Sequence, residues 1–380
     1  MSESITVEQL FHRAHLFITE GQREEALAVL DKIQVEDPAQ RRELAYLRAW
    51  CSTLGDHWDE AAQFLLSADV NEEPVSDIQA LGHTERRRRA HYLLLLGNIA
   101  VNLGRYEEAT RHYTRCIKFL DERRMNDVNV RIKARYGLGT AYTQTGFYSV
   151  ALAHYQDALR LCGEGSEHPE LPHIYYGLCD AHRHLGNFEL AFDYGKKALE
   201  LYVARSDKAM EGRMYNLLGR ICYQMREFQD ASYYYTEALT LAMSANRPEL
   251  IMNTLTALAD VRLAEARLAE ARRYCEHALE YKDRVTRKHY LGMLFIVCGK
   301  VAEAEAKKAE GQLARELVDE AISWYQKAES ELAAIEAKTE LAEVYGRLAQ
   351  ILESSGQHDR AIAYWKSAYA TYSGPEDALL

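Results

Sequence analysis

The sequence has few residues that interrupt helices, since only six of its 380 residues are proline. Proline removes a backbone hydrogen bond and breaks a helix interior, so long helices are allowed over most of the chain. No apolar run approaches the roughly 18 residues of a membrane-spanning helix. The start, Met-Ser-Glu-Ser, has neither a basic nor an apolar region, so we expect no signal peptide. These absences predict a cytoplasmic protein without a membrane partner.

The motifs of common catalytic sites are also missing. The sequence has no Gly-rich phosphate loop, no His-Glu-x-x-His pair and no strand-turn-helix nucleophile elbow. We therefore predict no enzyme activity, no catalytic residues and no cofactor. The net charge of -11 argues against a general nucleic-acid binder, because such binding comes mainly from neutralising phosphates. The one basic run, Arg86, Arg87, Arg88 and Arg89, is more typical of a solvated helix face or of a patch for an acidic partner.

The cysteines lack the pattern of a disulfide framework. There are seven, an odd number, and they are scattered along the chain, which is typical of reduced core residues in a cytosolic protein. One cluster could suggest a metal, because Cys179 and His182 lie three residues apart and could share a helix face. Their positions in the repeat described next assign both to packing between helices. We therefore predict no metal site.

A repeat dominates the rest of the sequence. Alanines recur at intervals of 40 residues, each after a turn and each followed by a second small residue seven positions on. The same pattern with altered spacing extends in both directions and gives nine copies. Their anchors are Ala26, Ala61, Ala109, Ala151, Ala191, Ala231, Ala271, Ala321 and Ala361. A period of this length indicates stacked supersecondary units.

Each copy is predicted to contain two helices. Small residues seven apart lie near one helix face and allow a partner helix to approach closely, so each alanine pair marks a second helix. Another small residue twelve positions before the anchor, such as Gly97, Gly139 or Gly219, marks a first helix. Such pairs cannot bury their apolar faces alone and must stack. We predict an all-α, right-handed superhelical solenoid of about nine pairs, as one domain over residues 1–372 with a flexible tail at 373–380.

These residues resemble the tetratricopeptide repeat (TPR) family. Residues 96–109 (LGNIAVNLGRYEEA) match its motif closely, and Phe17, Tyr142 and Pro38 match its late aromatic and its terminal proline. The usual repeat has about 34 residues, whereas most copies here have 40. We expect the extra residues in loops at 163–170, 203–210 and 243–250. Such long repeats are similar to those of kinesin light chains, Pins-type spindle proteins, the MalT regulator and bacterial peptide-pheromone receptors, which implies a binder of proteins or peptides.

In this family the first helices line a concave groove, so residues 18, 15, 11 and 8 positions before each anchor predict its lining. From the third to the seventh copy this lining contains no Glu, although the chain is acidic. It contains Asn, which pairs with backbone amides, Tyr, which offers apolar area, and Arg, which binds carboxylates. The predicted partner-binding residues are His91, Asn98, Lys133, Tyr136, Thr140, His173, Tyr176, Asp180, Arg183, Arg213, Asn216, Arg220, Tyr223, Asn253 and Asp260.

The sequence therefore predicts a non-enzymatic scaffold that holds a protein or peptide segment in the groove of the third to seventh copies. Lys133, Arg183, Arg213 and Arg220 bring four cations to that groove, so we expect a partner with an acidic group. The alternative is a peptide-sensing regulatory receptor resembling the bacterial pheromone receptors. Those receptors resemble one another in having an N-terminal DNA-binding or helical-bundle module. Here the repeat pattern already begins by Ala14, so we expect no such module, which argues against this alternative.

Other readings of the same pattern stay open at this point. The lining could be polar only because water reaches it, or the binding site could be the aromatic N-terminal groove of Phe11, Tyr46 and Trp50. A catalytic module within the repeats is the third class of function.

Before Ala321, ten extra residues of strong helix formers predict longer helices that meet near Gly311. The last copy has an acidic lining and is predicted to be a cap.

Overall fold

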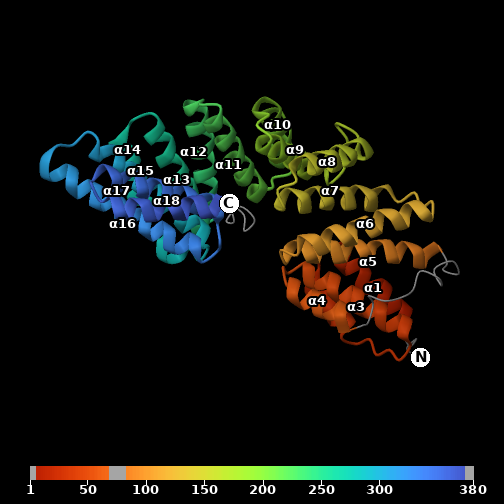
Figure 1. Ribbon diagram of the computed structural model, residues 1–380. Helices are drawn as coiled ribbons and strands as arrows, with labels where there is room; N and C mark the ends of the chain where they lie inside the picture. Colours follow the sequence, from red (N-terminus) through yellow and green to blue (C-terminus); the bar gives the residue numbers. More distant parts are fainter. Residues whose placement is uncertain (1–5, 68–82, 373–380) are drawn as a thin grey trace. The chain divides into compact units, whose positions relative to one another are not determined.

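The computed structural model of the protein describes residues 6–67 and 83–372, without the side chains of 67, 83–85 and 372. These residues form 18 α-helices and a short 3-10 helix, and no strand occurs among them (Figure 1). The helices are α1 (Val7–Thr19), α2 (Arg23–Leu30), α3 (Pro38–Thr53), α4 (Trp58–Ser67), α5 (His83–Asn102), α6 (Tyr106–Glu122), α7 (Val128–Gln144), α8 (Tyr148–Cys162), α9 (Leu171–His184), α10 (Phe188–Ala204), α11 (Lys208–Gln224), α12 (Phe228–Ser244), α13 (Pro248–Ala264), α14 (Leu268–Leu279), η2 (Lys282–Arg284), α15 (Lys288–Ala306), α16 (Gly311–Ala333), α17 (Lys338–Ser354) and α18 (His358–Tyr372).

The helices form nine pairs, as the sequence predicts, with an odd-numbered first helix and an even-numbered second helix in each. In eight of the pairs the second helix packs on its own first helix, and a second helix also packs on the first helix of the next pair, as α6 does on α5 and α7. This stacking buries the apolar faces that a single pair would expose. The small residues of the pattern lie at the contacts and are at most 1% exposed: Ala151, Ala158, Ala191, Ala198, Ala231 and Ala238.

A buried tyrosine four residues after the anchor fills the space beside the small residues of the first helices. The ring of Tyr155 lies between Gly139 of α7 and Gly177 of α9, and a Cβ atom at either glycine would be 2.5 Å from it. Tyr113 is enclosed in the same way by glycines of α5 and α7. Because interiors are close-packed, these rings require glycine opposite them.

The extra residues of the 40-residue copies lie mostly in helices. The loop predicted at 163–170 is present between α8 and α9. The predictions of long loops at 203–210 and 243–250 are wrong. There, helices of 17 residues are joined by connections of only three residues. Ser206 and Asn246 close these connections with φ angles of 57° and 46°, so one left-handed residue replaces a longer loop.

Contacts divide the chain into two compact units, unit 1 (Met1–Asn187) with α1 to α9 and unit 2 (Phe188–Leu380) with α10 to α18. Each unit has its own buried clusters, such as the one around Tyr113 in unit 1 and the one around Tyr325 in unit 2. One continuous domain over residues 1–372 stays a prediction, and the predicted tail at 373–380 lies outside the described residues.

The long helices expected near Gly311 are confirmed. α15 has 19 residues and α16 has 23, and Gly311 begins α16 with a φ angle of 62°.

A bilayer-spanning helix would have to be both long and apolar, and no helix in the described parts of the chain meets both conditions.

Candidate partner-binding face

The sequence-predicted binding residues lie on the first helices of both units. We name two sets by their unit. The unit 1 stripe consists of His91, Asn98, Lys133, Tyr136, Thr140, His173, Tyr176, Asp180 and Arg183 on α5, α7 and α9, and the unit 2 stripe of Arg213, Asn216, Arg220, Tyr223, Asn253 and Asp260 on α11 and α13. Lys133, Arg213 and Arg220 are exposed, Arg183 is buried, and the others are half-buried.

Hydroxyl groups from the second helices reach the unit 1 stripe. The hydroxyl of Tyr113 donates to Oδ1 of Asn98 at 2.8 Å, and that of Tyr155 lies 3.4 Å from Oγ1 of Thr140. Burial raises the pKa of both tyrosines, so each remains a neutral donor. The polar side chains of the stripe are therefore oriented by the helix pair itself. The sequence pattern places these tyrosines in the core but does not show their bonds to the stripe.

The basic groups of the unit 1 stripe are near carboxylates. Nζ of Lys133 lies 3.6 Å from Glu170, and Nε2 of His91 lies 3.8 Å from Asp127. Burial is the largest influence on His91 and lowers its pKa, which the charge of Asp127 only partly opposes. This stripe is therefore less basic than its composition suggests.

Arg183 differs from the sequence expectation of a cation that faces a ligand. It is 8% exposed, and its Nε and Nη2 donate to Oδ1 of Asp180 at 3.1 and 2.8 Å. The two residues are one helical turn apart on α9, where opposite charges meet readily. Their charges offset each other. Arg213 and Arg220 belong to the other unit, so the expected grouping of the three arginines stays a prediction.

Two arginines of the unit 2 stripe keep their charge exposed. Arg213 and Arg220 lie seven residues apart on α11, and neither forms an ion pair within the described part of the chain. Arg213 contacts Sδ of Met210 at 4.0 Å, and Arg220 lies near the buried side chain of Tyr235. A spacing of seven places both guanidinium groups on one side of the helix.

Polar groups around these arginines are held by neighbouring helices. Oγ1 of Thr254 donates to Oδ1 of Asn216 at 3.0 Å, and Nδ2 of Asn216 donates to the carbonyl of Gly212 at 3.2 Å. Tyr223 lies near Asp260, and the pKa of Tyr223 is raised by burial first and by the charge of Asp260 second. The unit 2 stripe thus combines oriented amide and hydroxyl groups with two exposed cations.

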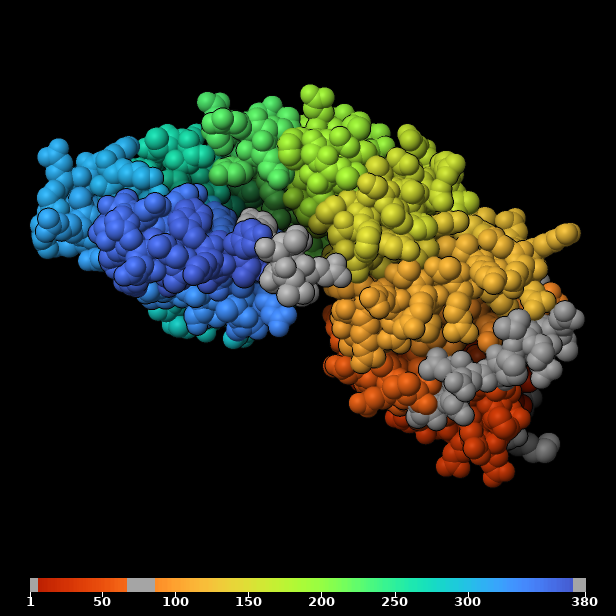
Figure 2. Space-filling view, viewed as in Figure 1, coloured from red at the N-terminus to blue at the C-terminus, as the bar shows by residue number. Residues whose placement is uncertain are grey.

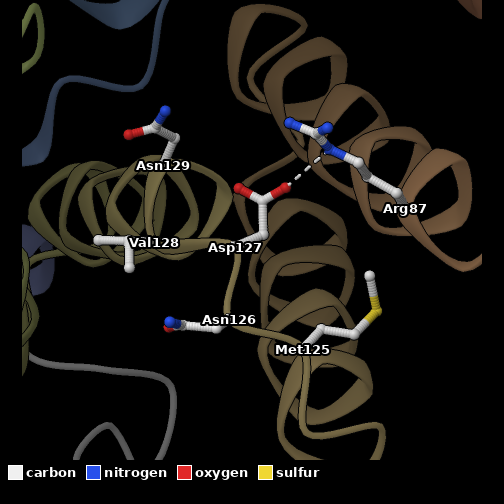
Figure 3. Close-up of a pocket in the computed structure, with 6 residues that line it drawn as sticks. All are labelled: Arg87, Met125, Asn126, Asp127, Val128 and Asn129. Carbon is white, nitrogen blue, oxygen red and sulfur yellow. Dashed lines mark hydrogen bonds and ion pairs between the residues drawn. The ribbon is translucent and has the colours of Figure 1, made fainter. Parts of the chain in front are cut away.

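A hollow of about 460 Å³ lies at the turn between α6 and α7, beside α5 (Figure 3). Its wall includes Asp127, which accepts a hydrogen bond from Nε of Arg87 at 3.2 Å. Arg88 pairs with Glu43 at 3.5 Å. Two of the four consecutive arginines at 86–89, Arg87 and Arg88, therefore form ion pairs with neighbouring elements. None of the predicted binding residues lines the hollow, although His91 reaches Asp127.

Six of the seven cysteines are buried, and Cys162 is half-buried. Cys179 and His182 are buried, and burial raises the pKa of the Cys179 thiol, as expected for packing residues. In the described ranges, no three His, Cys, Asp or Glu side chains come together as a metal site would require. All seven cysteines are free. Cys275 and Cys298 pack in the same buried cluster, a contact that sequence reasoning missed, although Cys275 occupies the tyrosine position four after Ala271.

Models of the tetratricopeptide repeat match residues 87–164, 130–202, 170–244 and 342–370. Compared by sequence, no curated protein matches the chain. Several solved structures are similar. The apo quorum sensor NprR from B. thuringiensis has a TM-score of 0.72 at 13% identity, over 97% of this chain and 99% of that one. A Rap protein complexed with Competence and Sporulation Factor has a TM-score of 0.64 at 12% identity, over 96% and 97%. Aspartyl phosphate phosphatase F from Bacillus subtilis has 0.60 at 11% identity, over 99% and 96%.

At such low identities the structural likeness concerns the fold alone. Sequence models and structure nevertheless agree about the repeats, because the matched residues coincide with helix pairs from α5 to α12 and with α17 and α18. The chain therefore contains tetratricopeptide repeats within an all-helical fold.

Proposed function

We propose that this protein is a non-enzymatic scaffold that binds a segment of another protein, or a peptide, along the first helices of the third to seventh repeats. The observation that carries the proposal is the pair Arg213 and Arg220, two exposed cations on one side of α11 in a chain of net charge -11. Exposed guanidinium groups bind carboxylates or phosphates through paired hydrogen bonds. The expected ligand therefore presents an acidic group to the unit 2 stripe.

The neighbouring polar groups support binding of an extended segment. Asn98 and Asn216 are each held by a hydroxyl group from an adjacent helix, at 2.8 and 3.0 Å. A carboxamide that is already oriented loses little entropy when it pairs with a peptide backbone. Tyr223 adds apolar area beside Arg220.

The test begins by purifying the full chain from its host and identifying what accompanies it by mass spectrometry. Binding of the identified segment to wild type and to an Arg213→Glu, Arg220→Glu variant is then measured by fluorescence anisotropy. Because two attractive charges become repulsive, we expect affinity to fall by more than about tenfold. Added salt should also weaken wild-type binding, since the charges are exposed.

A matched control variant changes the net charge equally outside the stripe. Arg273 of α14 and Arg315 of α16 are exposed in the same unit, and replacing both with Glu should leave affinity nearly unchanged. If both double variants bind as wild type does, the unit 2 stripe is not the site.

A second candidate is a peptide-sensing regulatory receptor. It is favoured by the near full-length likeness to NprR, described as a quorum sensor, and to a Rap protein complexed with Competence and Sporulation Factor. Recovery of a short free peptide favours this candidate, whereas recovery of a protein partner favours the scaffold. Because one neighbour is named an aspartyl phosphate phosphatase, phosphate release from acetyl phosphate should also be measured. Release above the buffer rate would contradict a non-enzymatic role.

A further inference from the structure

The last helix of unit 2 exposes an apolar face. On α18, Ile362, Trp365 and Tyr369 are 52%, 41% and 67% exposed. Their spacing of three and four residues places them on one side of the helix. Figure 2 shows α18, in dark blue, on the surface turned toward the viewer. Terminal elements of repeat proteins normally present a polar outer face, so this face requires an explanation.

The same positions are covered in other second helices. Trp365 and Tyr369 lie four and eight residues after their anchor, where α6 has Tyr113 and Ile117. Both α6 residues are buried in a cluster that includes Val130 of the next first helix, α7. The exposed face of α18 therefore continues the interface that joins successive pairs. A helix with an apolar side fits it.

The opposite end of the repeat series is more polar, although Leu16 of α1 is 46% exposed. In α7, Ala134 and Leu138 are buried against the preceding pair. The residues at the same distances from the anchor in α1 are Gln9 and Arg13, and both are exposed. A head-to-tail stack of chains, with α18 of one copy on α1 of another, would therefore bury polar groups against Trp365, at a cost.

We propose that two copies of this chain associate tail to tail, with α18 of one packing antiparallel on α18 of the other about a two-fold axis. Such an interface uses the same patch twice. The three apolar residues suit it, because an antiparallel arrangement brings Trp365 of both copies to the axis and sets Ile362 of each opposite Tyr369 of the other. α18 contains one acid, Asp359, against two bases, so this helix is less acidic than the chain as a whole.

The interface is small. One helix from each copy buries less than the roughly 1,200 Å² typical of stable complexes. We therefore expect a dimer that dissociates in the micromolar range. This association is independent of the function proposed above, because α18 carries no residue of either stripe.

Sedimentation velocity of the full chain, from low-micromolar to submillimolar concentration, tests the proposal. The mass should rise from 43.5 kDa toward twice that value. A Trp365→Glu, Tyr369→Glu variant should stay at the single-chain mass, with unchanged helicity by circular dichroism. As a control, Leu313 and Tyr233 are each 57% exposed elsewhere in unit 2, and replacing both with Glu should leave dimerisation intact.

Chemical cross-linking tests the antiparallel packing of the two α18 helices. With Lys366→Cys beside the axis, a short bismaleimide should produce a covalent dimer, whereas Gln312→Cys on the exposed start of α16 should not. A wild type that stays monomeric at every concentration overturns the proposal. This holds even if a variant without residues 373–380 forms a dimer. A dimer that survives the double variant, or that Lys366→Cys does not cross-link, overturns it equally.

Discussion

Glycine inside a helix is less favourable than alanine by about 1 kcal/mol, yet Gly139 and Gly177 occur in the interiors of α7 and α9. The reason is the ring of Tyr155 between them, which leaves no room for a methyl group on either helix. The packing of one side chain thus determines residues in two repeats. Local helix preference is overridden by tertiary contact.

Gly139→Ala should therefore destabilise the protein by about 1 to 3 kcal/mol, as overpacking does in other cores. The matched control is Gly212→Ala in α11, where a Cβ atom would be 3.7 Å from its nearest neighbour, an ordinary contact. That substitution should be neutral or slightly stabilising. Urea denaturation followed by circular dichroism compares the two, and equal midpoints would contradict the packing described here.

Several histidines should make stability depend on pH. Burial lowers the pKa of His15, His91, His112 and His154 below the usual 6.5. The unfolded chain then binds protons more readily than the folded chain, so the free energy of unfolding should fall as pH decreases from about 7.5 to about 5. Urea midpoints across this range measure the effect.

His154→Asn tests one contribution to this pH dependence. The ring of His154 stacks on Tyr142 with 5.5 Å between centroids and lies 3.1 Å from Nη1 of Arg135. Removing it should flatten the pH dependence, whereas His57→Asn at an exposed position should not. An identical slope in both variants would show that His154 contributes nothing.

At the scale of elements, Glu303 of α15 joins three helices. It accepts hydrogen bonds from the hydroxyl of Tyr325 in α16 at 3.0 Å and from Arg347 in α17 at 3.3 Å. Burial alone would raise the pKa of Glu303, but its bond to Lys307 and the charge of Arg347 keep that pKa low. The carboxylate therefore stabilises these helices above its usual pKa, and this contribution is lost as pH falls below it.

Glu303→Ala should cost about 1 to 3 kcal/mol, because the buried hydroxyl of Tyr325 loses its acceptor. Glu303→Gln keeps an acceptor and should cost less. Glu316→Ala on the exposed side of α16 serves as a control and should have little effect. Denaturant midpoints at neutral pH rank the three variants, and a glutamine as harmful as alanine would mean that the charge, rather than the acceptor, matters.

The helix pairs were predictable because small residues recur in register, but the helix ends were not. Asn246 and Pro248 after Met243 suggested a long loop, whereas Asn246 turns the chain alone and Pro248 begins α13, where a missing N–H does no harm. That the residues of the unit 1 and unit 2 stripes share one face of the first helices was predictable from the sequence. The pairing of Arg183 with Asp180 was not, because register indicates a face but not which side chains bond within it.

For the whole molecule, each helix pair is stabilised mainly by its neighbours, so opening should begin at the ends. Hydrogen–deuterium exchange should be faster in α1 and α18 than in α7 and α13, which have neighbours on both sides. Exchange in α18 should also slow as protein concentration rises, if tail-to-tail association occurs. Uniform exchange across all four helices would indicate one fully cooperative unit instead.

The regular three-residue connections have a consequence for how such a chain can change in length. Between α10 and α13, helix and connection repeat with a constant period, so a gain or loss of 40 residues keeps the anchor alanines and the helices in register. One residue gained or lost within a helix would instead rotate the rest of that helix by about 100° about its axis and turn its apolar face away from its neighbours. A gain or loss of complete units therefore preserves the packing in this region, whereas a residue added within a helix does not.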